Sequence, residues 1–274
     1  MMKKLFVLLL SCVILFSCAF AENEEENIEP GEGTIEFLVQ TEDSAESYTE
    51  IEGFAPDNVE RTILGRDNRI TISNTNQYPF SAIAYMEIWM KCGCQIAGTG
   101  FMVDRDKLLT AAHCLICQTH NKWAYGITFH FGHRKGKKDF YTYNNTWNAY
   151  CGTNFANGYV SDNDWAVVKL YKNVGDRTGW FGTRSLSDQQ VENGYYYISG
   201  YKDRILKMDV GKLHIKDSNE MWMDMDALPG NSGSPIYDSN NYAVGIWTTY
   251  YSNANSAVRL TSSILDYIRQ YKGK

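Results

Sequence analysis

From residue 62 onward, short apolar runs alternate with Gly, Asn and Asp. The clearest runs cover residues 81–89, 98–103, 107–112, 165–171, 195–199 and 242–248. Strands of this length at close spacing are typical of an antiparallel β-sandwich or barrel. One helix is expected near the C-terminus, where Thr261 can cap it and Ile264, Leu265 and Ile268 lie on one face. The pattern therefore predicts an all-β body followed by one helix.

Composition agrees with a folded, β-rich protein. The 274 residues are 44% hydrophobic and 21% charged, which is enough apolar content to bury a core and excludes a disordered chain. With 22 Gly and only 5 Pro, and without an internal repeat, the chain is not collagen-like or proline-rich. The 14% of aromatic residues fits pleated, half-buried surfaces.

Charge is divided unevenly along the chain. Residues 22–60 contain 14 Asp and Glu and no Lys or Arg, and residues 1–21 carry +2 from two lysines. The net charge of −6 therefore leaves the body from residue 61 onward with +6. We expect the acidic segment to be poorly ordered in isolation. The basic body is long enough for one all-β domain or two small ones.

The N-terminus predicts export. Lys3 and Lys4 precede an uncharged apolar stretch at 5–16, and Ala-Phe-Ala at 19–21 forms a cleavage motif, so residues 1–21 are interpreted as a signal peptide. Alternatively, Leu-Phe-Ser-Cys at 15–18 resembles a bacterial lipobox that would leave Cys18 lipidated. Because no other apolar run approaches the ~20 residues of a spanning helix, we expect a secreted or lipid-anchored protein without a membrane span.

Three local patterns carry candidate chemistry, in the order His, Asp, Ser. They are Thr-Ala-Ala-His-Cys at 110–114, Asp-Asn-Asp-Trp-Ala at 162–166 and Gly-Asn-Ser-Gly-Ser-Pro at 230–235. A serine hydroxyl needs a neighbouring base to become a nucleophile, and His supplies one near neutral pH. A buried carboxylate orients that His and stabilises its cation. Glycines beside the serine allow a tight turn and a close approach by substrate.

Each pattern also has a simple structural explanation. Alone, His113 could be a core histidine, Asp164 a turn residue and residues 230–235 a loop. Their occurrence together in one exported chain, each beside a strand-like run, favours the nucleophilic constellation.

These motifs resemble those of a chymotrypsin-fold serine protease, and most closely the secreted glutamyl endopeptidases of staphylococci and bacilli. The resemblance covers nearly all of 62–270 and includes residues 63–65 with Arg69, 99–103, 179–182, 198–201 and 259–261. It implies two six-stranded antiparallel β-barrels with the active site between them and a C-terminal helix.

The resemblance also assigns roles to residues. His113 is implied to be the general base, Asp164 its orienting carboxylate and Ser232 the nucleophile, with the N–H groups of Gly230 and Ser232 forming the oxyanion hole. Asp162 is the other candidate carboxylate, but the family places the acid directly before the strand, which favours Asp164.

The substrate-binding residues follow from the same comparison. Thr248, Thr249 and Tyr250 match the stretch that pairs with the substrate backbone. Trp247 occupies the position of the His, and Ala227 that of the Thr, that bind the substrate glutamate in the family, so we expect weak or lost Glu preference. Asp226 matches the residue that binds Lys or Arg in trypsin-like enzymes. P1 is the residue before the cleaved bond. Three P1 preferences stay open: Lys or Arg, a broad or apolar preference, and Glu.

The cysteines of the body depart from the family. Outside the cytosol cysteines tend to pair, but the usual partner position of Cys114 is Gly98. We expect disulfides among Cys92, Cys94, Cys114 and Cys117, with Cys151 left over; the same four could alternatively hold zinc. Because the first pair is tightly spaced and export favours disulfides, we expect no metal. The other histidines show no metal-ligand spacing in the sequence; they are His120, His130, His133 and His214.

The sequence thus predicts a signal peptide at 1–21, an acidic propeptide at 22–61 removed after Arg61 or Glu60, and a protease domain at 62–274. We expect a secreted, monomeric serine endopeptidase that acts on proteins or peptides without a cofactor. Nucleic acid is not an expected partner, because the basic run at 134–138 lacks interleaved aromatics. The alternatives are a catalytically inactive binding module with the same fold and a small-acyl esterase, although the Gly-x-Ser-x-Gly elbow of common esterases is absent.

Overall fold

A computed structural model describes residues 28–31, 63, 67–152, 155, 163–251 and 254–273. The predicted signal peptide, Cys18, most of the acidic segment, its expected cleavage site and Asp162 lie outside the described residues.

The first sheet is built from the N-terminal half of the body. Its strands are β2 (Ile83–Met90), β3 (Gln95–Met102), β4 (Lys107–Thr110), β5 (Ile116–Cys117), β6 (Lys122–Phe131), β7 (Tyr141–Tyr143), β8 (Trp147–Cys151) and β9 (Ala166–Leu170). They are hydrogen-bonded in the order β5-β6-β2-β3-β4-β9-β8, with β7 on β6, and all pairs are antiparallel.

The second sheet contains the remaining strands. They are β1 (Ile70–Thr71), β10 (Gly182–Thr183), β11 (Tyr196–Lys202), β12 (Ile205–Gly211), β13 (Leu213–Ile215), β14 (Glu220–Met223), β15 (Pro235–Tyr237), β16 (Tyr242–Tyr251) and β17 (Ala254–Arg259). Their order is β1-β12-β11-β15-β16-β17-β14-β13, and β10 pairs with β16. All six predicted apolar runs are therefore strands, with ends shifted by a few residues.

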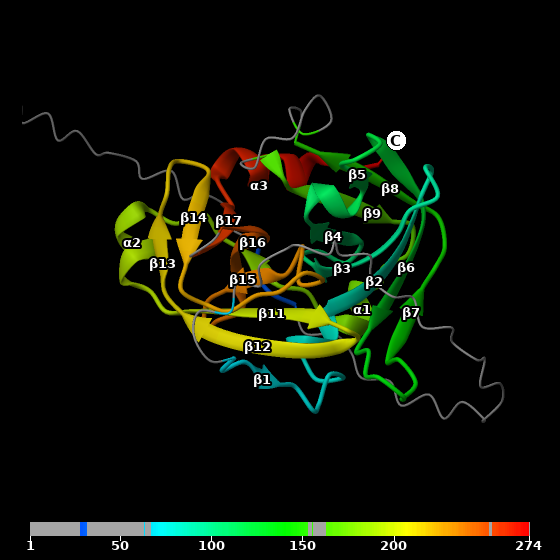
Figure 1. Ribbon diagram of the computed structural model, residues 1–274, viewed down its shortest axis with the longest axis horizontal. Helices are drawn as coiled ribbons and strands as arrows, with labels where there is room; N and C mark the ends of the chain where they lie inside the picture. Colours follow the sequence, from blue (N-terminus) through cyan, green and yellow to red (C-terminus); the bar gives the residue numbers. More distant parts are fainter. Residues whose placement is uncertain are drawn as a thin grey trace, which may run out of the picture.

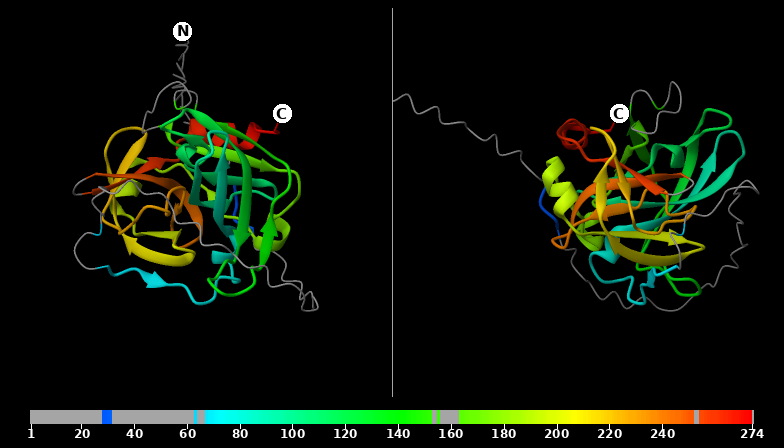
Figure 2. Two further views of the ribbon diagram at one scale, coloured as in Figure 1. Left: turned by 45° about the vertical axis from the view of Figure 1, so that its right-hand side comes forward. Right: turned by 60° about the vertical axis from the view of Figure 1, so that its left-hand side comes forward.

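The two sheets lie side by side, each strongly curled, as the two views of Figure 2 show. Their facing surfaces share a buried aromatic contact, because the ring of Phe181 lies 5.7 Å from that of Phe101 on β3 and 5.0 Å from that of Tyr237 on β15. The predicted all-β fold of two barrel-like halves is confirmed, with short strands such as β1, β5, β7 and β10 added to the longer ones.

The predicted C-terminal helix is present as α3 (Ser262–Gln270), in red in Figure 1. Thr261 caps it by accepting a hydrogen bond from the Ile264 N–H, and Ile264, Leu265 and Ile268 are buried. Two further short helices, α1 (Gly175–Thr178) and α2 (Asp188–Asn193), were not predicted. Among the described residues, no helix is long and apolar enough to cross a bilayer.

Residues 28–31 of the acidic segment contact the body through backbone bridges and hydrogen bonds. Ile28 bridges to Thr183 and Gly31 to Trp180. The Gly31 N–H donates to the Trp180 carbonyl at 2.9 Å, and the Trp180 indole donates to the Glu29 carbonyl at 3.0 Å. The Tyr242 hydroxyl also donates to the Glu29 carboxylate, so this part of the segment is held by backbone pairing and by side-chain hydrogen bonds.

Candidate active site

Strand register brings His113 and Asp164 together. His113 lies in the 3₁₀ turn Ala112–Cys114, just after β4, and Asp164 lies just before β9. These strands are antiparallel neighbours with Thr110 opposite Ala166. The C-terminal end of β4 therefore lies beside the N-terminal start of β9, which brings the two side chains together although they are 51 positions apart in the chain.

The carboxylate of Asp164 holds His113 through two contacts. Its Oδ2 lies 2.6 Å from His113 Nδ1, and its Oδ1 accepts a hydrogen bond from the His113 backbone N–H at 2.9 Å. Asp164 is 0% exposed. Burial by itself would lower the pKa of His113, but the Asp164 carboxylate outweighs this effect and raises that pKa well above 6.5. The pair therefore fixes the imidazole orientation and stabilises its protonated form.

The loop from Leu228 to Ser234 is folded by its own hydrogen bonds. The Oδ1 of Asn231 accepts from the Leu228 N–H at 2.8 Å, and the Asn231 N–H donates back to the Leu228 carbonyl at 2.9 Å. Gly230 and Gly233 have φ of 100° and 87°, the left-handed region that favours glycine. At Gly233 a side chain is also excluded by space, because a Cβ would lie 2.1 Å from the Thr99 carbonyl oxygen.

This loop is attached to the first sheet at the position of Ser232. The Ser232 carbonyl accepts a hydrogen bond from the Thr99 N–H at 2.8 Å, and the Cys114 thiol contacts the same oxygen at 3.6 Å. Ser232 therefore lies against the residue that follows His113. Within the described chain, no hydrogen bond joins the Ser232 hydroxyl to the His113 ring, so of the three side chains only those of His113 and Asp164 are hydrogen-bonded to each other.

The N–H groups of the loop fall into two sets. Those of Asn231, Gly233 and Ser234 donate to the carbonyls of Leu228, Trp247 and Asn231 at 2.9 Å each. Those of Gly230 and Ser232 donate to none of the described residues. Two N–H groups flanking the buried Asn231 are thus available to a developing oxyanion.

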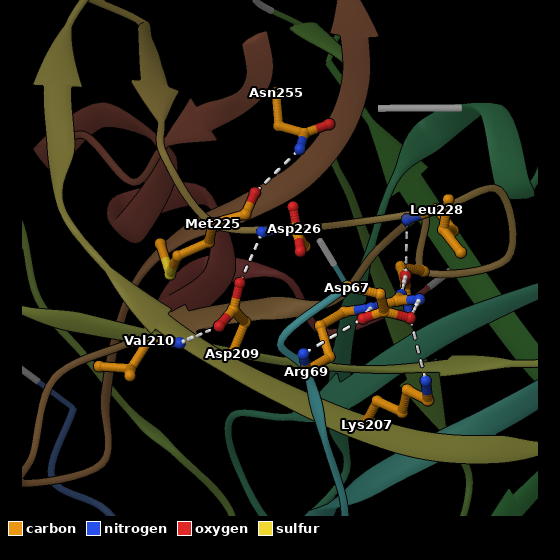
Figure 3. A network of polar contacts seen from close by, with 10 residues as sticks. Asp67, Arg69, Lys207, Asp209, Val210, Met225, Asp226, Leu228 and Asn255 are labelled. Atoms are coloured by element: carbon orange, nitrogen blue, oxygen red, sulfur yellow. Dashed lines mark hydrogen bonds and ion pairs between the residues drawn. The ribbon is translucent and has the colours of Figure 1, made fainter. Parts of the chain in front are cut away.

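The predicted specificity residues are buried. Trp247 is 1% exposed and packs with Ala227 in the apolar core of the second sheet. Asp226 is 4% exposed, and its N–H donates to Asp209 Oδ2 at 2.7 Å. Figure 3 shows this contact beside the bond from the Asn255 amide to the Met225 carbonyl. The backbone at 225–226 is consequently fixed from two sides.

Arg69 makes a contact with the serine loop that the sequence did not predict. Its side chain is 4% exposed; it pairs with Asp67 at 3.0 Å and donates to Asn231 Oδ1 at 3.2 Å. The hydrogen bond from Arg69 lowers the pKa of Asp67, on which Lys207 also converges (Figure 3). The resemblance included Arg69 as part of a motif, but a contact across 162 positions leaves no local sequence signal.

The predicted substrate strand lies at the end of β16. Thr249 and Tyr250 pair with Ser256 and Asn255 of β17, and the register shifts at Thr248. On the other side, β15 pairs with β16 only as far as Ile246. Among the described strands, none covers that edge of 248–250, so an extended peptide can add there.

The cysteines do not follow the predicted pattern. All five described cysteines are free thiols. Cys114 is buried near Gly98, where an added Cβ would lie 2.8 Å from its sulfur, and it does not join the other cysteines. Cys92, Cys94 and Cys117 instead lie together with His120. The predicted set of four cysteines is therefore wrong in including Cys114.

Comparison with known proteins gives a consistent family relationship. The family model of the trypsin-like peptidase domain matches residues 98–246. A glutamyl endopeptidase of Bacillus licheniformis is 23% identical over 241 residues, covering 77% of this chain and 69% of the relative. A Bacillus subtilis protein named extracellular metalloprotease is 25% identical over 219 residues, with the same coverage.

Solved structures show the same fold. A Glu endopeptidase in complex with MPD superposes with a TM-score of 0.68 at 25% identity, covering 75% of this chain and 97% of that one. An inactivated protease paralogue of the scabies mite superposes at 0.55 with 14% identity, covering 70% and 96%.

The name of the Bacillus subtilis relative implies a metal, but the candidate metal-binding groups of this chain lie away from the candidate active site. Among the described residues, groups of three or more side chains that could reach one ion are formed by Cys92, Cys94, Cys117 and His120, and by His130, His133 and Asp139. Neither includes His113, Asp164 or Ser232. The candidate active site therefore does not fit a metal centre.

Proposed function

Because this chain belongs to the trypsin-like peptidase family, we propose that it is a secreted serine endopeptidase whose reaction is carried by Ser232, His113 and Asp164. The observation that carries the proposal is the 2.6 Å contact between His113 Nδ1 and the buried Asp164 carboxylate. It leaves Nε2 of the imidazole for proton transfer, and the attachment of the Ser232 backbone to Thr99 supports a nucleophile at the same junction.

The proposed reaction has two halves. The Ser232 oxygen attacks the peptide carbonyl while His113 takes the hydroxyl proton, forming a tetrahedral intermediate. The imidazolium returns the proton to the leaving amine, and the acyl-enzyme remains. Water then attacks the ester with the same proton transfers and releases the acid. Asp164 keeps its charge throughout and stabilises the imidazolium.

Oxyanion stabilisation is assigned to the Gly230 and Ser232 N–H groups. Between them lies the N–H of Asn231, which already donates to the Leu228 carbonyl. Donors held in place before reaction stabilise the oxyanion without reorganisation, and removal of one such donor costs about 10²–10³-fold in kcat.

We propose a broad or apolar P1 preference. Trp247 and Ala227 place an indole and a methyl group where glutamyl endopeptidases hold the substrate carboxylate. Neither side chain carries a charge that could pair with a buried carboxylate, and a buried charge without an ionic partner costs several kcal/mol. If the P1 preference were for Lys or Arg, Asp226 would be the residue that binds the basic side chain.

Activation is proposed to follow removal of residues 22–61. This segment is opposite in charge to the body, and its residues 28–31 pair with Trp180 and Thr183. Blocking cleavage with Glu60→Gln and Arg61→Gln together should leave an uncleaved, less active chain. A fully active purified form that begins at residue 22 would contradict a propeptide role.

Secretion is proposed from the N-terminal signal, and the relative named extracellular agrees with it. Lipidation of Cys18 is the other route, and mass spectrometry of the mature N-terminus distinguishes them. The measurement is made on the uncleaved Glu60→Gln/Arg61→Gln chain, because removal of residues 22–61 would erase the difference. In that chain, an N-terminus at residue 22 indicates signal-peptide cleavage, and an acylated Cys18 at the N-terminus indicates a lipid anchor.

An inactive binding module is the second candidate, because the fold is shared with an inactivated protease paralogue. Hydrolysis of a peptide library by the processed protein, with Ser232→Ala as the blank, separates the two. We expect kcat to fall by about 10⁶-fold in the variant. Equal turnover by both proteins would exclude the proposed nucleophile, and absence of turnover in both would favour the binding module.

A further inference from the structure

Two hairpin turns of the first sheet bring four metal-binding side chains together. Cys92 and Cys94 lie in the turn between β2 and β3; Cys117 is the last residue of β5, and His120 lies in the turn between β5 and β6. The turns are neighbours because β2 and β6 are paired strands, and the Lys91 N–H donates to the Trp123 carbonyl at 3.0 Å.

The distances match a tetrahedral ion. The sulfurs of Cys94 and Cys117 are 4.0 Å apart, and His120 Nδ1 lies 3.6 Å from the first and 3.4 Å from the second. All four ligand atoms lie within 4.8 Å of one another. Zinc bonds of about 2.3 Å to sulfur and about 2.0 Å to nitrogen give tetrahedral edges of roughly 3.8 Å and 3.6 Å. We propose that Cys92, Cys94, Cys117 and His120 bind a structural Zn²⁺.

The backbone of each turn is closed by its own hydrogen bond. In the first, Gly93 has a φ of 88° and donates its N–H to the Met90 carbonyl at 2.9 Å. In the second, the Asn121 N–H donates to the Cys117 carbonyl at 2.7 Å. Each turn therefore presents its two ligands from a closed, hydrogen-bonded loop, as a tetrahedral site requires.

The donor chemistry favours zinc over a disulfide framework. Three thiols are an odd number, so one disulfide among them would leave the third thiol and His120 without a role. Three thiolates with Zn²⁺ carry one net negative charge, and two lysines flank the site: Lys91 directly precedes Cys92, and Lys122 pairs with Cys117. Four protein ligands also leave no open position for water, so the site is structural and not catalytic.

The location suggests what the ion does. Cys117 follows His113 by four residues, and the intervening Leu115 carbonyl accepts the Ala124 N–H at 2.8 Å. A metal bound at Cys117 would therefore hold the segment beyond His113 to the β2–β3 turn. It would provide the local crosslink that a disulfide to Cys114 cannot, since Gly98 occupies the partner position.

Metal analysis of the purified full-length chain tests the proposal. We expect one zinc per chain in the unmodified protein, loss of zinc in Cys94→Ser and His120→Ala, and retention in His120→Cys, which restores a fourth thiolate. Cys151→Ser is the matched control, because Cys151 is a free cysteine of β8 outside the cluster. It should keep its zinc.

Cobalt substitution provides a second readout that does not depend on a variant folding. The unmodified chain, refolded with Co²⁺, should show the thiolate charge-transfer and tetrahedral d–d absorption bands. A mature chain without zinc, a disulfide between two of the cluster cysteines, or undiminished zinc in both loss variants would overturn the proposal. The site shares no residue with the proposed catalytic groups, so hydrolysis with Ser232→Ala as blank tests that function separately.

Discussion

The imidazole of His113 has one nitrogen engaged by Asp164, and this contact determines its protonation as well as its orientation. Asp164 is fully buried and accepts both a ring contact and a backbone N–H. The backbone contact ties the carboxylate to the same residue whose ring it orients. A carboxylate in this position raises the pKa of the imidazole and makes proton transfer from a serine hydroxyl less costly.

Replacing Asp164 by Asn should lower kcat by about 10⁴-fold, because the amide can hold the wrong tautomer and no longer stabilises the imidazolium. Loss of the carboxylate also removes the cause that raises the pKa of His113, so the acid limb of kcat/KM should move to lower pH. Stopped-flow or steady-state profiles across pH measure both effects. Asp176→Asn, which alters an exposed pair with Arg105, is the control; a loss below tenfold in Asp164→Asn would contradict the assignment.

The specificity residues lead to a second prediction at this scale. The processed enzyme should cleave after apolar residues and at least about tenfold more slowly after Glu, since Trp247 and Ala227 provide no charge partner. A peptide library read for the unmodified enzyme and for Asp226→Asn measures this. Dominant cleavage after Lys or Arg that collapses in the variant would instead assign Asp226 as the specificity residue.

At the scale of elements, β3 connects the two sheets at the serine loop. The buried Thr99 hydroxyl donates to the Gly230 carbonyl at 3.1 Å and accepts the Tyr201 N–H of β11 at 3.0 Å. The Thr99 N–H binds Ser232, and its carbonyl accepts from Thr110 of β4 at 2.8 Å. One residue thus links β3, β4, β11 and the loop that carries the proposed nucleophile.

Thr99→Val should therefore reduce both stability and activity. The change is nearly isosteric but leaves the Tyr201 N–H and the Gly230 carbonyl without this partner, at a cost of about 2 kcal/mol in the free energy of unfolding. We also expect a lower kcat with little change in KM, because Gly230 supplies a proposed oxyanion donor. Urea denaturation and kinetics check these effects. Thr71→Val, on the exposed strand β1, should change the stability by less than about 0.5 kcal/mol; equal effects of both variants would exclude the proposed role.

At the scale of the whole molecule, a buried polar cluster stabilises the first sheet away from the serine loop. His130 of β6 and His133 each contact Asp139 at 2.6 Å, and Glu87 of β2 lies 3.5 Å from His130. Arg204, in the turn after β11, also pairs with Glu87, and Tyr85 stacks on His133. The cluster therefore connects both sheets through charged groups.

This cluster predicts how stability depends on pH. Burial by itself would lower the pKa of His130, but its hydrogen bonds to Asp139 and Glu87 outweigh burial and raise it from 6.5 to about 9. Its contribution, on the order of 3 kcal/mol, is present below pH 6.5 and lost as pH rises through about 9. Burial by itself would raise the pKa of Asp139, but its hydrogen bonds to His130 and His133 outweigh burial and lower the pKa from 3.8. The contribution of Asp139 is therefore present above that pH and lost in acid.

The measurement is the urea midpoint between pH 5 and pH 10. It should fall across pH 6.5–9 in the unmodified protein and fall less steeply in Asp139→Asn, which is already destabilised at pH 6. Glu192→Gln, which alters the exposed pair with His214, should keep the full pH dependence. A midpoint that rises with pH in this window would contradict the direction of the His130 shift.

Several features were accessible from the sequence because they depend on neighbours in the chain. Alternating apolar runs predicted the strands, and the cap at Thr261 predicted α3. The missed helix α2 had a comparable signal, since Ser187 and Gln190 form a capping box at its start. The resemblance also identified His113 and Asp164, whose contact then followed from the pairing of β4 with β9.

The sequence by itself determined the strand pattern, the fold class and the residue types offered for catalysis, because periodicity and short motifs encode them locally. Only the tertiary structure decided the partners of side chains far apart in the chain. In that structure Arg69 is hydrogen-bonded to Asn231, Cys114 lies apart from the other thiols, and His120 lies beside Cys94 and Cys117. The physical reason is that such contacts depend on which hairpins become neighbours and in which register, and that choice is made by packing over the whole chain.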